Sequence, residues 1–140
     1  MTEDLKIAKQ ILRSCGCTCV FVKRGRVIFT SSERGVEPIY KALKKHLNEL
    51  WGSSLADKVI GKGAAFLAVQ AKVKELFTNI LSEEAKMVLE NNGIKFYYNN
   101  LVPNILNRQG NDLCPVEKLT KDINESQQAL SAIRGFLKDY

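Results

Sequence analysis

A chain of 140 residues with 45% hydrophobic content can bury its own core, so we expect one domain over residues 1–140 that needs no metal or disulfide to fold. No apolar run reaches the ~18 residues of a membrane span, and the acidic start Met1–Asp4 differs from a signal peptide, which excludes a membrane protein and predicts a cytoplasmic one. Residues 5–74 carry fourteen Lys and Arg against four Asp and Glu, and this basic half favours an anionic partner.

The spacing of apolar residues predicts the helices and strands in the first half of the chain. Apolar residues at helical spacing predict a helix over residues 4–14, which Gly16 ends. Alternating residues predict two strands within 17–29, joined by a glycine turn into a hairpin. Pro38 suits a first helical turn, and the apolar stripe after it predicts a helix that ends at residues 51–53.

The second half alternates strands and helices. A buried strand, a glycine turn and a helix of small apolar residues occupy residues 55–69. After them we expect a strand over 72–81, a helix over 83–90 capped by Ser82, a strand over 94–98, an irregular stretch over 99–112, a short helix after Cys114 and a last helix capped by Asn124. This order predicts an α/β fold, a three-layer α/β/α sandwich around a mixed five-stranded sheet with the N-terminal hairpin at one side.

Three cysteines, Cys15, Cys17 and Cys19, crowd into five residues near the N-terminus. Alternate residues of a strand are poor disulfide partners, so in a cytosolic chain we expect reduced thiols. On a strand Cys17 and Cys19 would share one face about 7 Å apart, which is wider than a usual metal chelate. We therefore interpret these cysteines as small buried residues.

In this element order the helices beginning at Gly35 and Lys62 direct their N-termini to the same end of the sheet, as in cytidine-deaminase-like folds. A zinc deaminase has His-x-Glu or Cys-x-Glu at the first helix start and Pro-Cys-x-x-Cys at the second. Here no ligand stands two residues before Glu37, and residues 61–66 contain no cysteine. We therefore expect no zinc deaminase chemistry, no metal and no cofactor.

Short motifs along almost the whole chain resemble a family of small, uncharacterised bacterial and archaeal proteins, a domain-of-unknown-function family with a cytidine-deaminase-like fold that lacks the zinc ligands. The motifs are Thr18-Cys19-Val20, Arg34-Gly35, Asp57-Lys58-Val59-Ile60-Gly61-Lys62, Leu101-Val102-Pro103, Asn107-Arg108 and Cys114-Pro115-Val116-Glu117-Lys118. The resemblance implies this fold and a ligand pocket, but it does not imply any particular activity. One departure is Gly63, where members of that family carry alanine.

The pocket is predicted at the glycine turn. Glycine-containing helix N-termini bind anions readily, and an arginine before such a start can clamp a phosphate or carboxylate. The expected ligand-binding residues are Arg34, Gly35, Asp57, Lys58, Gly61, Lys62 and Gly63. Asp57 and Lys58 are adjacent on a strand and so face opposite ways, and an ion pair with a neighbouring helix is the alternative interpretation of this pair.

Cys114 stands at a helix start, where the pKa of a thiol can fall, and Glu117 follows three residues later. Both are candidate catalytic residues. A nucleophilic cysteine usually needs an orienting histidine, and the single histidine, His46, lies in a helix beside its apolar stripe.

Three functions stay open. The favoured one is binding of a small anionic or nucleotide-like molecule. The others are a metal-independent enzyme that uses Cys114 or Glu117, and RNA binding, which the scarcity of aromatic residues in the basic half disfavours. The sequence is compatible with a homodimer and leaves the oligomeric state open.

Overall fold

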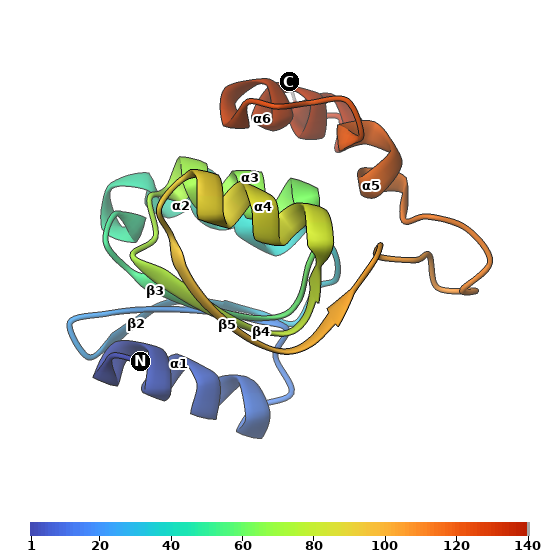
Figure 1. The fold of residues 1–140 in the computed structure, drawn as a ribbon. Coiled ribbons are helices and arrows are strands. Elements are labelled where there is room, and N and C mark those ends of the chain that lie inside the picture. Colours follow the sequence, from blue (N-terminus) through green and yellow to red (C-terminus); the bar gives the residue numbers. More distant parts are fainter. Residues whose placement is uncertain (140) are drawn as a thin grey trace.

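One mixed five-stranded sheet forms the centre of the structure, a computed structural model that describes residues 1–139 (Figure 1). The strand order is β2-β1-β3-β4-β5. The strands are β1 (Cys19–Lys23), β2 (Arg26–Ser31), β3 (Ser54–Ile60), β4 (Glu75–Ser82) and β5 (Lys95–Val102). β1 is antiparallel to both β2 and β3, whereas β3, β4 and β5 run parallel. The predicted mixed sheet with an N-terminal hairpin at one side is confirmed.

Helices cover both faces of this sheet. They are α1 (Glu3–Ser14), α2 (Glu37–Leu50), α3 (Lys62–Ala71), α4 (Glu83–Asn91), α5 (Pro115–Thr120) and α6 (Ser126–Phe136). α1 lies below the sheet, α2, α3 and α4 lie above it, and α5 and α6 form an outer layer over them (Figure 1). The α/β/α sandwich is confirmed. No helix within residues 1–139 is long and apolar enough to cross a bilayer.

Helix α3 is the buried middle of the upper layers, since it contacts the sheet, the flanking helices α2 and α4, and both α5 and α6. Every residue from Lys62 to Ala68 is buried. A helix that is apolar all round is stable only where all sides are covered, which explains the run of small residues predicted from the sequence. At its first turn Gly63 lies against the side chain of Val116 in α5.

Replacing Gly63 by alanine is expected to lower the free energy of unfolding by about 1–3 kcal/mol, because overpacking displaces a packed element. The added Cβ would lie 2.5 Å from Cγ1 of Val116. Gly135 is the matched control: it lies in α6 with nothing within 4 Å of an added Cβ, so Gly135→Ala should stabilise by roughly 0.5 kcal/mol. Urea unfolding measures both, and a Gly63→Ala variant as stable as the parent would show that α5 is not held against α3.

The cysteines differ from the prediction. Cys15 and Cys17 form a disulfide, with their Cα atoms 5.4 Å apart, within the usual range for such a bridge. The expected strand geometry is wrong here because β1 begins only at Cys19 and Gly16, at φ +69°, turns the chain between the two cysteines. Cys17 packs with α1 below the sheet, whereas Cys19 packs above it, so the two do not share a face.

Candidate functional site

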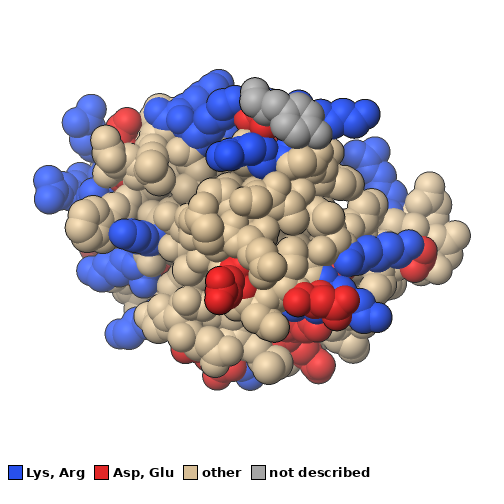
Figure 2. Space-filling model, turned by 90° about the horizontal axis from the view of Figure 1, so that it is seen from above, with Lys and Arg blue, Asp and Glu red and all other residues tan. Residues whose placement is uncertain are grey.

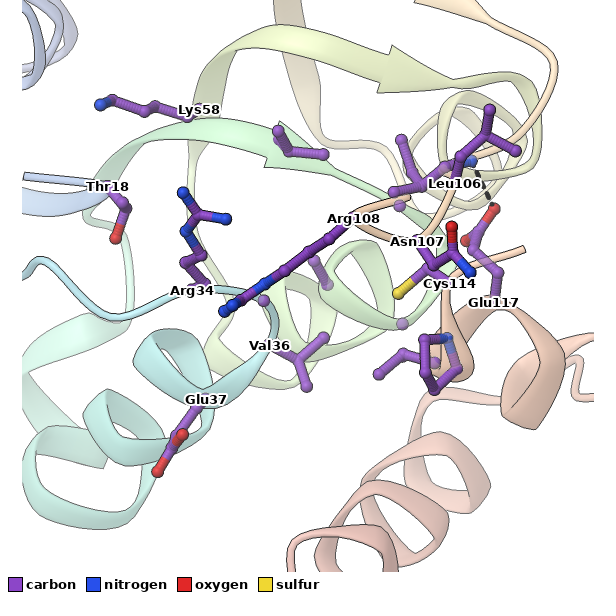
Figure 3. A pocket seen from close by; sticks show the side chains of 18 of the residues that line it. Thr18, Arg34, Val36, Glu37, Lys58, Leu106, Asn107, Arg108, Cys114 and Glu117 are labelled. Carbon is purple, nitrogen blue, oxygen red and sulfur yellow. Dashed lines mark hydrogen bonds between the residues drawn. The ribbon is translucent and has the colours of Figure 1, made fainter. Parts of the chain in front are cut away.

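A cavity of about 800 Å³ opens where the carboxyl end of β3 meets the starts of α2 and α3 (Figure 3). The loop after β5, the start of α5 and the end of α6 complete its wall. The predicted site residues that line it are Arg34, Gly35, Asp57, Lys58, Gly61, Gly63, Cys114 and Glu117. The structure therefore brings together residues that the sequence distributes over 84 positions, and Lys62 is the predicted residue that it leaves out.

Asp57 is a buried carboxyl group in this wall, only 5% exposed. It stands opposite Cys19 in the antiparallel β1–β3 pair, on the face of the sheet that carries α2 and α3. Its Oδ1 accepts a hydrogen bond from the backbone N–H of Val59 at 3.2 Å, while Oδ2 has no partner among residues 1–139. Burial raises the pKa of Asp57 from 3.8 to about 8, against the opposing effect of the hydrogen bonds that it accepts. The same burial, together with the nearby Asp57, raises the pKa of the Cys19 thiol.

Glu117 holds three segments together at the start of α3. Its Oε1 accepts from the backbone N–H of Lys62 at 3.0 Å, and its Oε2 accepts from the backbone N–H of Ile105 at 3.2 Å. The approach requires glycine at position 61, because a Cβ there would lie 2.8 Å from Oε1 of Glu117. The carboxyl group of Glu117 thus occupies one of the free N–H groups at the start of α3, where the sequence predicted that an external anion would bind.

Lys62 is turned away from the cavity. Its side chain is buried, and its ammonium group donates to the backbone carbonyl of Lys121, the C-cap of α5, at 2.9 Å. A cation at a helix C-terminus interacts favourably with the exposed carbonyl groups there. In this structure the side chain of Lys62 therefore docks α5 onto α3 rather than contributing to the predicted anion site.

Two arginines border the mouth of the cavity. Arg34 precedes α2, and Arg108 lies in the loop after β5, from which its side chain extends towards the side of the cavity that carries Arg34 (Figure 3). Within residues 1–139 neither forms a salt bridge, whereas Glu37 at the same mouth pairs with Lys41 at 3.4 Å and points away. Lys58 also points away from the cavity in this view. The positive potential therefore comes chiefly from the two guanidinium groups.

Arg108 is the main functional candidate that sequence reasoning missed, because residues 99–112 read as irregular. The loop is in fact ordered by its own polar groups: the backbone N–H of Asn107 donates to the carbonyl of Asp112, and the N–H of Cys114 donates to Ile105. These bonds fold the loop back on itself and present Arg108 and Gln109 at the cavity. The Asn107-Arg108 motif of the family resemblance was the one available signal.

The roof of the cavity comes from the end of α6, which the sequence also did not connect with the site. Phe136 and Leu137 line it. Asp139 fixes this end over α2, since its carboxyl group accepts from the Tyr40 hydroxyl and from the Lys44 ammonium, both at 2.7 Å. The thiol of Cys114 points into the cavity from the start of α5 (Figure 3).

The donor set does not fit a catalytic zinc ion. The start of α3 offers two glycines, a buried lysine and alanines where a zinc deaminase needs two thiolates. Both oxygens of Glu117 already accept from backbone N–H groups. Within residues 1–139 no three His, Cys, Asp or Glu side chains lie close enough together to hold a metal.

Comparisons with known proteins identify structures with a similar fold. The chain is similar to a DUF1893 family protein (TM1506) from Thermotoga maritima, with a TM-score of 0.88 and 26% identity over 100% of this chain and 92% of that one. It is also similar to RibD from Acinetobacter baumannii, with a TM-score of 0.54 and 15% identity over 69% of this chain and 35% of RibD. The second likeness concerns the fold alone and confirms the deaminase-like architecture. No curated protein matches the sequence.

The family itself follows from the sequence. The family model described as TM1506, domain of unknown function (DUF1893), matches residues 7–137, which is nearly the whole chain. The resemblance found from the short motifs is confirmed. The chain belongs to the DUF1893 family.

Proposed function

We propose that this protein binds a small anionic, nucleotide-like molecule in the cavity between α2, α3 and the loop after β5. The observation that carries the proposal is the pair of guanidinium groups, Arg34 and Arg108, that border one cavity without an acidic partner within residues 1–139. Guanidinium groups bind phosphate or carboxylate bidentately. The start of α2 adds to this potential, because no side chain caps it.

The alternative of a thiol enzyme has weaker support. Cys114 points into the cavity, but a nucleophilic thiol is usually activated by a neighbouring base. His46 does not line the cavity: its ring packs against Phe29 and its Nδ1 lies 3.1 Å from Glu49. Glu117 is engaged by two backbone N–H groups. We therefore assign Glu117 a positioning role and leave Cys114 as part of the lining.

RNA binding is also less well supported. Seen from above, Lys and Arg side chains lie mainly around the rim of the molecule, and the central part shows uncharged and some acidic side chains rather than one continuous basic track (Figure 2). Lys41, Lys44 and Lys118 are moreover paired with acidic side chains. Single-stranded nucleic acid is usually bound in a basic groove that also offers aromatic rings for stacking. A cavity lined by residues from several elements suits a small molecule better.

The test is a binding screen of nucleoside monophosphates, ribose 5-phosphate and inorganic phosphate against three arginine variants. We expect at least one phosphorylated probe to raise the melting temperature of the parent, since a ligand that binds only the folded state stabilises it. Arg34→Met and Arg108→Met should each weaken that probe by about tenfold or more, which corresponds to the loss of a charged hydrogen-bonding pair.

The matched control is Arg26→Met, because Arg26 is an exposed arginine of β2 outside the cavity. It should bind the probe as tightly as the parent. The proposal fails if no probe in the screen stabilises the parent, or if Arg26→Met weakens binding as much as the two cavity variants do.

A further inference from the structure

One oxygen of a buried carboxyl group in the cavity wall lacks a partner. Oδ2 of Asp57 receives no hydrogen bond within residues 1–139, although the residue is only 5% exposed. A buried polar atom without a partner is costly, and such atoms in native proteins call for an explanation. Because Asp57 borders the cavity, a molecule in the cavity could supply the missing partner.

The neighbouring hydroxyl donors of the chain are committed elsewhere. The hydroxyl of Thr18, next to Cys19 and also in the cavity wall, donates to the carbonyl of Ser31 at 3.1 Å. The hydroxyl of Thr78, which is paired with Asp57 across β3 and β4, donates to the carbonyl of Ile80 at 3.0 Å. Lys58 points away from the cavity. The thiol of Cys19, opposite Asp57 on β1, is the one further donor beside this carboxyl group, and a thiol is a weak donor. No strong donor of the neighbouring chain therefore satisfies Oδ2.

We propose that Asp57 recognises the uncharged head group of the same ligand, and that this head group presents an N–H donor beside a hydrogen-bond acceptor, as the edge of a nucleobase does. This inference rests on the proposed function, in which the anionic end of the ligand lies at Arg34 and Arg108. The ligand class is then a base-bearing phosphate, a nucleoside monophosphate or a close analogue.

The chemistry of the carboxyl group supports an uncharged partner. Burial raises the pKa of Asp57 to about 8, so at neutral pH the group is mainly the neutral acid. A carboxylic acid offers an O–H donor and a carbonyl acceptor side by side, which complements an amide or amidine edge. A cationic head group would enter a cavity that already holds two arginines. Val36, Ile105 and Val116 supply apolar surface suited to the face of a ring.

The test compares Asp57→Asn and Asp57→Leu, which have nearly the shape of aspartate. Asparagine keeps a neutral donor beside an acceptor, and leucine offers neither. With AMP, CMP, GMP and UMP as probes, we expect Asp57→Asn to bind the preferred nucleotide within about threefold of the parent, and Asp57→Leu to bind it about 10–100-fold more weakly, the loss typical of a site that hydrogen-bonds its substrate. Ribose 5-phosphate, which lacks the base, should bind equally to all three proteins.

Each other outcome overturns the inference in a distinguishable way. If Asp57→Asn loses as much affinity as Asp57→Leu, the ionised carboxylate is the binding form and the head group is cationic. If ribose 5-phosphate binds the parent as tightly as every nucleotide does, the phosphate site stands and the base site does not. If no probe binds the parent, this inference falls together with the proposed function. Melting curves of both variants establish that they are folded.

Discussion

Asp57→Asn is expected to raise the free energy of unfolding by about 2–4 kcal/mol at pH 8 and to leave it nearly unchanged at pH 4, the size expected when burial opposes ionisation of a carboxyl group. In the native protein this carboxyl group is buried, and burial raises its pKa from 3.8 to about 8. Each pKa unit corresponds to about 1.4 kcal/mol, and relaxation of the protein around the ionised group makes the effect smaller than the full shift implies.

The direction of the pH dependence follows from which state holds the proton. Between about pH 4 and pH 8 the unfolded chain has lost the proton of Asp57, while the folded protein keeps it. The free energy of unfolding of the parent therefore falls as the pH rises through this window, and it loses nothing further from Asp57 above pH 8. The asparagine variant lacks this titration, so the difference between the two proteins grows from pH 4 to pH 8.

Urea unfolding at half-unit steps from pH 4 to pH 8.5 measures this difference. Asp139→Asn is the control of opposite sign, because the hydrogen bond from Lys44, together with that from Tyr40, lowers the pKa of Asp139. That variant should lose a little stability above pH 4. The other ionisable groups close to Asp57 or bordering the same cavity are Cys19, Arg34, Glu37, Lys58, Arg108, Cys114 and Glu117. A parallel pH profile for the parent and Asp57→Asn would contradict the buried neutral acid.

The order of elements and the layered sheet could be predicted from the sequence because they depend on short-range patterns. The small residues of α3, the cap at Ser82 and the hairpin at β1 and β2 are each visible within a dozen residues. The ends of the elements were predicted less accurately. The strand predicted from residue 72 begins at Glu75, because Lys72 takes the left-handed conformation that ends α3.

The sequence predicted most of the candidate site residues that line the cavity, but not the contacts that these residues make. Which way Lys62 points depends on Lys121, 59 residues away, and the capping of α3 depends on Glu117, 55 residues away. Contacts between residues so far apart in the sequence leave no periodic pattern from which they could be predicted. The disulfide was missed for a different reason, because the assumption of a strand at Cys17 overlooked the turn that Gly16 permits. Arg108 was hidden in a loop whose order comes from hydrogen bonds among Asn, Asp and backbone groups.

Glu117→Ala is expected to lower the free energy of unfolding by about 3–5 kcal/mol, the size expected when a buried network loses its central acceptor and leaves a void. The carboxyl group is only 5% exposed, and it accepts from the backbone N–H groups of Lys62 and Ile105. Glu117→Gln should cost less, because its amide keeps one oxygen acceptor for one of the two donors. Urea unfolding of both variants, with the exposed Glu90→Ala as a control near zero, checks the order.

Gly61→Ala tests the same contact from the other side. In the parent an added Cβ would lie 2.8 Å from Oε1 of Glu117 and 3.0 Å from Ile105, so the variant should be destabilised by about 1–3 kcal/mol. In the Glu117→Ala background the main obstacle is absent, and the same substitution should cost much less. Additive effects in this double-mutant cycle would show that the two residues do not interact.

The cycle also bears on binding, because Glu117 joins α5, the start of α3 and the loop that carries Arg108. Loss of this contact frees the segment at Ile105, so the backbone amide hydrogens of Lys62 and Ile105 should exchange faster with solvent while those of β3 stay protected. Arg108 would then be held less firmly, and a phosphorylated ligand should bind Glu117→Ala more weakly even where the protein is fully folded. A variant that is destabilised but binds the ligand as tightly as the parent would show that Glu117 stabilises the fold and does not determine the shape of the cavity.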